Sequence, residues 1–342
     1  MKKLFNDPST MVDDMIDGFV SACPHVRRGA LDPRIVVRRR NRKDPDSSVT
    51  LLIGNGSGHE PIAMGFVGQG VLDANVVGDV FAAPSADLIL DGIREVNGAA
   101  GTILLISRHS GDVINGRAAT MLAEEEGMKV VPLLMYDDIS AAPPERRADR
   151  RGAPGTMFIY KILGAAAEAG WPLERLMRLG EDVRERTVTL AAAVSPGTSP
   201  LTGQPMFSLP DDEIYLGMGV HGEPGMGRVK TGPVRNLVEE MIRRLLDDRP
   251  IPEGGRAAVI VNGMGGTTMM ELLTIWAETV KSLALHKVRA IAPMVGSFVT
   301  TQETGGFSIS LFEPDDEMLG FWCAPSDTPA FPKVELTDEC PA

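Results

Sequence analysis

An apolar run at residues 49–53 that ends among closely spaced glycines constrains the fold of this chain more than any other feature. The run predicts a buried strand, and Gly54, Gly56 and Gly58 follow it, each separated by one residue. Glycine allows the backbone to turn with positive φ and to approach a ligand closely. His59 comes next, at the end of the strand, where ligands bind in open α/β sheets. The motif alone is compatible with a binding site and with an ordinary strand-to-helix turn.

A second stretch of the chain has the same character. Residues 214–220 again form a strand-like run, and the sequence His-Gly-Glu-Pro-Gly follows at residues 221–225. Each of the two strand ends therefore places a histidine, a glutamate and a proline among glycines, in a chain with five histidines. This pairing favours a site assembled from two halves, with His59 and His221 as candidate residues.

Short apolar runs alternate with helical stretches along the rest of the chain. The further predicted strands are residues 35–37, 76–81, 101–106, 130–135, 257–261, 288–295 and 307–312. Such alternation is typical of βαβ units and of a largely parallel sheet. With 342 residues the chain is longer than one typical domain. We therefore expect an α/β fold of two domains, residues 1–190 and 191–342, with mostly parallel or mixed sheets flanked by helices. A helix over residues 173–193 is predicted to link them.

Composition and charge exclude several classes of protein. The net charge of −12 is unfavourable for binding nucleic acid, because neutralising phosphates requires clustered lysine and arginine. No apolar run approaches the roughly 20 residues that span a bilayer. The start of the chain, Met-Lys-Lys-Leu-Phe, lacks the apolar segment of a signal peptide. We therefore expect a cytoplasmic protein with neither a nucleic-acid nor a membrane partner.

The sequence does not predict a metal site. Its three cysteines, Cys23, Cys323 and Cys340, show no paired spacing, which argues against a disulfide framework and against a zinc site. Asp137 and Asp138 could be read as a magnesium site. In a chain without a nucleotide-binding loop, an acidic strand end or helix cap is the simpler interpretation.

The sequence also lacks the usual nucleotide-binding loop. The pattern Gly-x-x-x-x-Gly-Lys-[Ser/Thr] is absent. The glycine-rich residues 262–268 lie between a predicted strand and a predicted helix, and are interpreted as a tight connection between them. Anion binding through the backbone N–H groups of this segment is the alternative.

Segments along nearly the whole chain carry a family resemblance: residues 54–61, 78–87, 110–112, 150–152, 161–170, 219–225, 263–273 and 305–311. In this order they resemble the dihydroxyacetone-binding subunit of dihydroxyacetone kinases, of the type built from separate ketose-binding and nucleotide- or phosphocarrier-dependent subunits. The resemblance is highly specific for the family and less specific for the sugar.

The resemblance implies that the keto-sugar is held covalently. In the family an imidazole adds to the ketone carbonyl and forms a hemiaminal, and this histidine corresponds to His221 in the C-terminal domain. Neutral imidazole is available near pH 7, and the adduct fixes a small polyol and discriminates against glycerol. His59 and Asp112 match the other two reactive positions, and we expect them to act as a coupled acid–base pair without assigning the base to either. The sugar oxygens would be bound by Gly56, Ser57 and Gly58.

The segment before Asp112 departs from the family pattern. Family members commonly have Lys-Asn-Tyr where this chain has Ser107, Arg108 and His109. The lysine that contacts the substrate or the incoming phosphoryl group therefore corresponds to Ser107. Arg108 or His109 is a candidate to replace its charge, although arginine and lysine are not interchangeable at a tight site. The smaller Ser107 would leave room for a longer ketose such as erythrulose.

Three functions remain open at this point. The first is the ketose-binding subunit of a dihydroxyacetone-type kinase. The chain would bind no cofactor itself, and a nucleotide-binding partner subunit would carry ADP or ATP with magnesium, recharged in some systems by a phosphocarrier. The alternatives are a tetrulose (erythrulose) kinase subunit and a non-catalytic ketose sensor that acts on a regulator. The resemblance also implies a homodimer.

Overall fold

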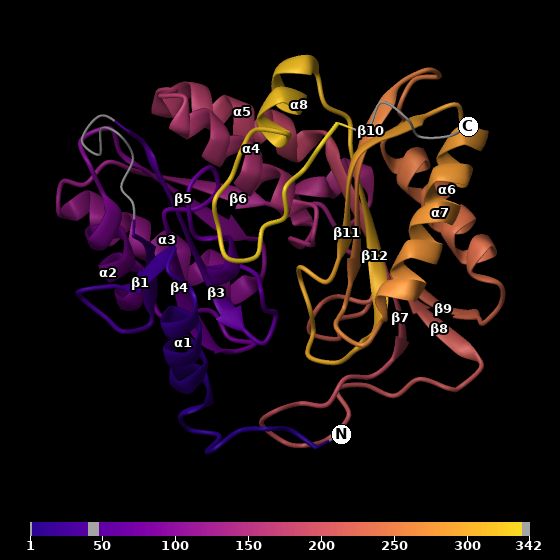
Figure 1. Ribbon diagram of the computed structural model, residues 1–342, viewed down its shortest axis with the longest axis horizontal. Helices are drawn as coiled ribbons and strands as arrows, with labels where there is room; N and C mark the ends of the chain where they lie inside the picture. Colours follow the sequence, from indigo (N-terminus) through magenta and orange to yellow (C-terminus); the bar gives the residue numbers. More distant parts are fainter. Residues whose placement is uncertain (1, 40–47, 337–342) are drawn as a thin grey trace.

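Two six-stranded sheets with helices on both faces make up the fold (Figure 1). The computed structural model describes residues 2–39 and 48–336. Helix α4 (Thr156–Glu168) lies between the two sheets, with α5 (Leu173–Glu185) and α8 (Asp316–Trp322) beside it. The described part of the chain contains no helix with the length and apolarity needed to cross a membrane.

The first sheet has the strand order β1-β2-β4-β3-β5-β6. Its strands are β1 (Val26–Arg28), β2 (Ile35–Arg38), β3 (Thr50–Ser57), β4 (Ala74–Val80), β5 (Thr102–Ser107) and β6 (Val130–Met135). β4, β3, β5 and β6 are parallel, and β1 and β2 add an antiparallel edge. The helices of this half are α1 (Met11–Ala22), α2 (Ala86–Val96) and α3 (Ser110–Glu125), and a 3-10 turn, η1 (Met64–Phe66), connects β3 to β4.

Strand β3 is buried on both of its faces. Leu52 packs with α2 and α3, in the same core as Ile93 and Ala119. Leu51 and Ile53 point the other way, into the core that contains α4. A strand covered by helices on both faces reads as a continuous apolar run rather than as an alternating one. This is why residues 49–53 were recognisable as a buried strand.

The second sheet has the order β11-β10-β12-β7-β8-β9. Its strands are β7 (Thr187–Ser195), β8 (Glu213–Leu216), β9 (Gly227–Lys230), β10 (Arg256–Gly263), β11 (Arg289–Gly296) and β12 (Gly305–Phe312). Helices α6 (Val234–Asp248) and α7 (Met269–Leu285) cover one face, and a short 3-10 segment, η2 (Pro144–Asp149), precedes α4 in the chain. The other face of the sheet packs towards α4.

Helix α4 joins the two halves through one shared core. Every residue from Thr156 to Ala167 is buried, which places this helix inside the protein. Lys161, the one charged side chain in that span, donates to the carbonyl oxygen of Phe321 at 3.0 Å. Phe158 packs on Phe312 of β12 and on Trp322 of α8, with ring centroids 5.0 and 4.6 Å apart. The two sheets are therefore held by contacts that cross between them.

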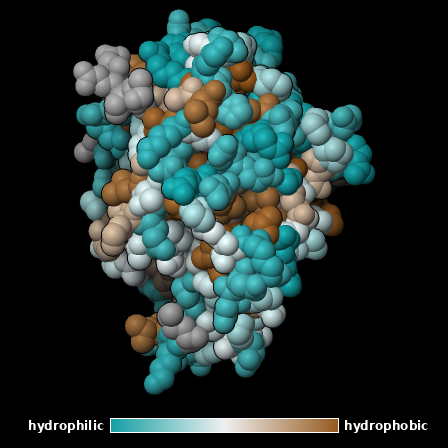
Figure 2. All heavy atoms as spheres, turned by 90° about the vertical axis from the view of Figure 1, so that its right-hand side faces the viewer, coloured by the Kyte–Doolittle hydropathy of each residue, from teal (hydrophilic) through white to brown (hydrophobic). Residues whose placement is uncertain are grey.

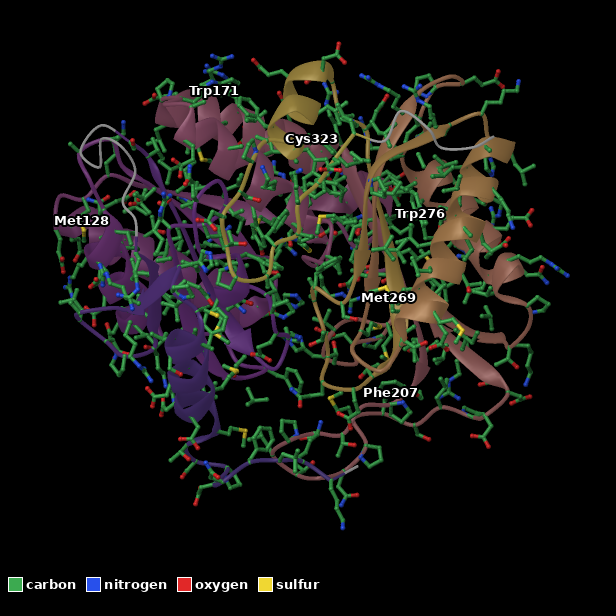
Figure 3. The ribbon with its side chains drawn as sticks, in the orientation of Figure 1. Met128, Trp171, Phe207, Met269, Trp276 and Cys323 are labelled. Carbon is green, nitrogen blue, oxygen red and sulfur yellow. The ribbon has the colours of Figure 1, made fainter. Side chains whose placement is uncertain are left out.

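The end of the chain returns to the first half. After α8, the backbone N–H groups of Gln69 and Asp327 donate to each other's carbonyl oxygens at 3.0 and 2.9 Å. Phe331 packs edge-on against Phe66 of η1. Figure 3 shows Cys323 at the end of α8, and Trp171 nearby stacks edge-on with Phe321. Cys23 and Cys323 are free, and Cys340 lies outside the described residues.

The structure confirms the expected fold class and corrects two details. The predicted helix over residues 173–193 is wrong, because α5 ends at Glu185 and Thr187 begins β7. The alanines at 191–193 favour helix in isolation, but here they pair with β12 and β8 in the sheet. The second sheet is also mostly antiparallel, with only β10 and β11 parallel. Antiparallel strands need no long crossover, which fits the short loop of residues 297–304 between β11 and β12.

Exposed apolar side chains gather on the outer side of the second sheet (Figure 2). They include Val194, at 47% exposure, and three residues of α7: Met269, Met270 and Leu273, at 53%, 77% and 52%. Figure 3 places Met269 at the beginning of that helix. An apolar patch of this kind on a folded chain is typical of an interaction surface.

Candidate functional site

His59 stands two residues after the end of β3, at the turn that the glycine pattern predicted. Gly58 has φ of +100°, a conformation that side chains rarely adopt, and a Cβ there would lie 2.6 Å from the ring of Phe81. The backbone N–H of Gly58 donates to Glu60 Oε1 at 2.9 Å. The chain therefore turns sharply at this point and brings the imidazole of His59 back over the end of the strand.

His221 lies on the loop that follows β8. The loop closes on itself so tightly that a Cβ on Gly225 would lie 1.9 Å from the carbonyl oxygen of Gly217. Arg151 connects this loop to the first half of the chain by hydrogen bonds. Its Nη1 donates to Pro224 O at 3.3 Å, and its Nη2 pairs with Asp138 Oδ2 at 2.8 Å.

The two predicted histidines meet in the site. Nε2 of His59 and Nε2 of His221 are 3.0 Å apart. On its other side, His59 Nδ1 is 2.7 Å from the carbonyl oxygen of Thr300, and this short contact fixes the plane of the ring. The ring of Phe81 covers both, with centroids 5.0 Å from His59 and 5.7 Å from His221. The site is thus assembled from two halves of the chain, as the sequence indicated.

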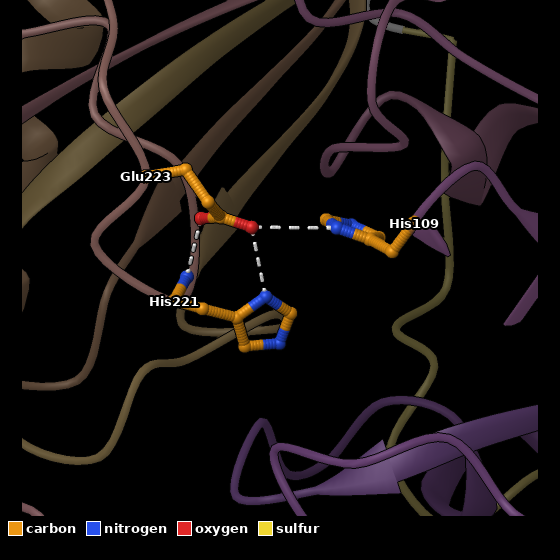
Figure 4. Close-up of side chains that lie close together, drawn as sticks. All are labelled: His109, His221 and Glu223. Carbon is orange, nitrogen blue, oxygen red and sulfur yellow. Dashed lines mark hydrogen bonds and ion pairs between the residues drawn. The ribbon is translucent and has the colours of Figure 1, made fainter. Parts of the chain in front are cut away.

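Glu223 connects His221 to a third histidine, His109. Its Oε1 is 3.0 Å from Nδ1 of His221 and 3.5 Å from Nδ1 of His109, and its Oε2 accepts from the backbone N–H of His221 at 2.9 Å (Figure 4). His109 Nε2 lies 3.2 Å from the carbonyl oxygen of Gly152. The carboxylate therefore holds both rings in fixed orientations.

Asp112 lies in the first turn of α3, close to these histidines. Its Oδ1 is buried and has no hydrogen-bond partner among the described residues. Burial raises its pKa to about 6, against the opposing charges of His109 and His221. An unpartnered carboxylate with such a pKa is available to exchange a proton near neutral pH.

Burial and neighbouring charges shift the pKa values of His59, Glu223 and His109 in different directions. Burial, reinforced by the neighbouring His221, lowers the pKa of His59 to about 3, so this ring is neutral near pH 7. Burial alone would raise the pKa of Glu223, but hydrogen bonds from His109 and His221 hold it well below its usual range. Burial alone would lower the pKa of His109, but its contact with Glu223 outweighs this and raises it. The contact with Glu223 therefore favours the protonated form of the His109 ring, which lies two residues after Ser107.

A cavity of about 60 Å³ opens between these side chains. Five of the seven predicted residues line it: Gly56, His59, Ser107, Asp112 and His221. Two do not line it. The Oγ of Ser57 is buried and has no hydrogen-bond partner in the described part of the chain. The N–H of Gly58 donates to Glu60 within the loop, and its carbonyl oxygen accepts from Gln302. Arg108 turns away and pairs with Asp149.

Sequence reasoning missed two residues that orient the histidines. Glu223 stands two positions after His221, and that spacing was a usable signal. Thr300 could not be found, because it is 241 residues from His59 and contributes only its backbone carbonyl. Asn262 holds this segment in place, since its Oδ1 accepts from the backbone N–H groups of Phe298 and Val299 at 2.9 Å each.

The two adjacent aspartates after β6 anchor loops. Asp137 accepts hydrogen bonds from the backbone of Ala153 and Gly155 and from the hydroxyl of Thr189. Burial raises its pKa to about 7. Asp138 pairs with Arg151, as described above. The carboxylates therefore fix the segment that leads to Gly152, which accounts for them without a magnesium ion.

Comparison with known proteins identifies the family of this chain. Residues 17–330 match the model of the Dak1 domain. The chain is 39% identical over 317 residues to the dihydroxyacetone-binding subunit of PTS-dependent dihydroxyacetone kinase 1 of Listeria innocua, covering 93% of this chain and 95% of that subunit. It is 35% identical over 333 residues to the D-erythrulose kinase of Mycolicibacterium smegmatis, covering 97% of this chain and 57% of that protein.

Solved structures of dihydroxyacetone kinases and of a related co-activator are also similar to this chain. The dihydroxyacetone kinase of C. freundii, crystallised with AMP-PNP and Mg²⁺, superposes with a TM-score of 0.89 at 33% identity. The match covers all of this chain and 63% of that one. A dihydroxyacetone kinase operon co-activator superposes with a TM-score of 0.88 at 29% identity, over 94% of this chain and 98% of that one. The chain thus belongs to the Dak1 domain family, the family of the dihydroxyacetone-binding subunits of dihydroxyacetone kinases.

Proposed function

We propose that this chain is the ketose-binding subunit of a dihydroxyacetone-type kinase, a phosphotransferase with an alcohol group as acceptor. The observation that carries the proposal is the fixed orientation of His221. Its Nδ1 faces Glu223, so its Nε2 is directed towards the cavity and towards His59. A neutral ring with its hydrogen on Nδ1 has a lone pair on Nε2, the atom needed to attack a carbonyl carbon.

In the proposed reaction the ketose replaces the contact between the two histidines. Nε2 of His221 forms a bond to the carbonyl carbon, and the π electrons of the C=O bond move to the oxygen, which takes up a proton. The proton on Nδ1 of His221 is transferred to the carboxylate of Glu223, which lies 3.0 Å away. The product is a hemiaminal that contains every atom of the ketose. Glycerol has no carbonyl group and cannot form it.

Phosphoryl transfer then uses the groups on the other side of the cavity. A hydroxyl of the bound ketose attacks the terminal phosphoryl group of ATP on the partner, the bond from that phosphorus to the bridging oxygen breaks, and ADP leaves. Asp112 and His59 act as a coupled pair that removes the proton of the attacking hydroxyl. His109, whose contact with Glu223 favours its protonated form, takes the electrostatic place of the family's lysine. The nucleotide, ADP or ATP with magnesium, resides on a partner subunit. Support for this comes from the C. freundii kinase crystallised with AMP-PNP and Mg²⁺, 63% of whose chain the match covers.

An erythrulose kinase subunit is the second candidate. Ser107 lines the cavity where the family commonly has a lysine, and a relative of the chain is named as a D-erythrulose kinase. A non-catalytic ketose sensor is the third, supported by the likeness to an operon co-activator. A sensor would form the adduct but would yield no ketose phosphate with any nucleotide-loaded partner.

Intact-protein mass spectrometry under non-denaturing conditions tests the proposal. The chain is incubated with dihydroxyacetone, erythrulose or glycerol, and His221→Ala serves as the control. We expect a mass gain equal to one whole ketose, absent with glycerol and in the variant. Equal gains in the wild type and the variant would refute covalent binding at His221. The ketose with the larger gain at a given concentration is assigned as the preferred ligand.

The same proposal includes a homodimer. The apolar patch of Val194 and the beginning of α7 is the surface we assign to the contact between subunits. Light scattering on the purified protein measures its mass. A dimer that dissociates on Met270→Glu supports this assignment, and a dimer that persists in the variant contradicts it.

A further inference from the structure

Three side chains of the site, those of His109, His221 and Glu223, have the donor atoms and the spacing of a metal site (Figure 4). One donor atom from each lies within 4.8 Å of the other two. Glu223 Oε1 is 3.0 Å from one imidazole Nδ1 and 3.5 Å from the other. In a tetrahedral zinc site with bonds of about 2.1 Å, ligand atoms are about 3.4 Å apart. We propose that these three side chains bind Zn²⁺, with a fourth coordination position open to the cavity.

The carboxylate of Glu223 is oriented so that one of its two oxygens can bind a metal. Its Oε2 already accepts a hydrogen bond from the backbone N–H of His221, and it lies 4.0 Å from Nη1 of Arg151. Oε1 is therefore the oxygen that faces the two rings. Two imidazoles and one carboxylate, with one open position, is a ligand set found in zinc enzymes, and imidazole is a preferred ligand of zinc.

A count of ring hydrogens gives an independent argument. His59 Nδ1 and His109 Nε2 face carbonyl oxygens, and the Nδ1 atoms of His109 and His221 face Glu223. Carbonyl and carboxylate oxygens only accept, so these four contacts need four ring hydrogens. The contact between His59 and His221 needs a fifth. Three neutral histidines carry three hydrogens in total, so the network without a metal requires two additional protons.

A divalent ion at the centre removes this shortage. It would replace both contacts to Glu223, and three contacts would remain to be filled by three ring hydrogens. His109 Nε2–H would donate to Gly152 O, His221 Nε2–H to His59 Nε2, and His59 Nδ1–H to Thr300 O. Metal-binding histidines characteristically donate their second ring hydrogen in this way. Zn²⁺ therefore satisfies every contact of the network with all three rings neutral.

Metal binding and ketose binding would then exclude each other. A metal on Nδ1 of His221 moves the hydrogen of the neutral ring to Nε2, and that atom no longer has a lone pair for the carbonyl carbon. This consequence rests on the proposed function, whereas the metal site itself does not. Zn²⁺ would thus be a reversible inhibitor that competes with the ketose.

The metal site is tested first, on protein without an affinity tag. Calorimetric titration of the metal-free chain with Zn²⁺ should give one site per chain. His109→Gln and Glu223→Gln should each weaken binding at least about 100-fold, since even outer-shell partners of a metal contribute about 10- to 100-fold. His286→Gln, at an exposed histidine after α7, is the matched control and should bind as the wild type does. Circular dichroism of each metal-free variant checks that it is folded.

Co²⁺ serves as a spectroscopic probe of the same position. The strong visible absorption of tetrahedral Co²⁺ is expected in the wild type and not in His109→Gln. Absence of Zn²⁺ binding, unchanged binding in both ligand variants, or the weak spectrum of six-coordinate Co²⁺ would each overturn the proposal.

Ketose binding is then measured with and without Zn²⁺. We expect the adduct in metal-free protein and its loss when the site is saturated with Zn²⁺. An adduct that persists when the site is saturated with Zn²⁺ would show that metal and ketose do not exclude each other. Absence of the adduct in metal-free protein contradicts the proposed function instead. It does not affect the metal site, which the calorimetric titration with Zn²⁺ tests separately.

Discussion

Replacing Asp112 by asparagine should separate ketose binding from phosphoryl transfer. Asparagine has the same size but cannot take up a proton, so turnover should fall by about 10²- to 10⁴-fold, the usual contribution of a general acid or base. Among the residues that the structure describes, Asp112 makes no hydrogen bond to His221, and its buried Oδ1 has no partner. The hemiaminal should therefore still form in the variant.

The pH dependence of the wild type follows from the pKa of about 6 of Asp112. One unit above this value, at pH 7, the ratio of ionised to protonated carboxyl is about 10 to 1, and at pH 5 it is about 1 to 10. The rate at saturating ketose should fall to one half near pH 6 and about tenfold by pH 5.

The folded-state pKa of Asp112 lies above the ordinary value of 3.8, so this group lowers the stability of the fold as pH rises from about 4 through 6. Asp112→Asn should accordingly unfold at the same or a higher temperature than the wild type at pH 7.

The assay supplies the chain with its nucleotide-loaded partner subunit and measures ketose phosphate from pH 5 to pH 8. Adduct formation and thermal unfolding are followed in parallel. A rate that does not change between pH 5 and pH 7, or a variant within about tenfold of the wild type, would refute the role of Asp112. Loss of both turnover and adduct would show that Asp112 acts in binding.

Three further changes, the last with a control variant at an exposed arginine, test other parts of the site and the fold. Glu223→Gln removes a charge-assisted hydrogen bond worth about 1.5–3 kcal/mol, so the dissociation constant of the ketose should rise about 10- to 150-fold. Ser107→Lys should shift the ratio of rates from erythrulose towards dihydroxyacetone by about tenfold or more, and an unchanged ratio would remove this residue as the determinant of specificity. Arg150 is buried and its partner Asp248 is largely covered, so Arg150→Met leaves that carboxylate unpaired and should lower the free energy of unfolding in urea by about 3–5 kcal/mol. Arg94→Ala breaks an exposed pair and should cost about 0–1 kcal/mol; equal losses in the two arginine variants would contradict this interpretation.

Local sequence patterns were sufficient where the determining contacts are local. The buried strand β3 and the turn that presents His59 follow from an apolar run and three glycines, because both effects act within a few residues. For His221 the apolar run of residues 214–220 was only partly a strand, because β8 ends at Leu216 and His221 lies in the loop that follows. The sequence nevertheless indicated that the two histidines would meet, because each has a glutamate, a proline and glycines as neighbours.

Non-local contacts explain most of what was missed. The alanines of β7 have high helix propensity, and only pairing with strands on both sides makes them a strand. Thr300 orients His59 through a backbone carbonyl, which leaves no mark in the sequence. His109 was considered only as a replacement for a lost charge, and its contact with Glu223 depends on how the two halves of the chain approach each other.

Carbon-13 NMR of a ketose labelled at its carbonyl carbon tests the central claim most directly. On binding to the metal-free chain, the signal of the trigonal carbonyl carbon should be replaced by that of a tetrahedral carbon bonded to nitrogen. The change should be absent in His221→Ala. A bound ketose whose labelled carbon keeps the shift of a ketone would contradict the assignment of His221 as the residue that holds the substrate.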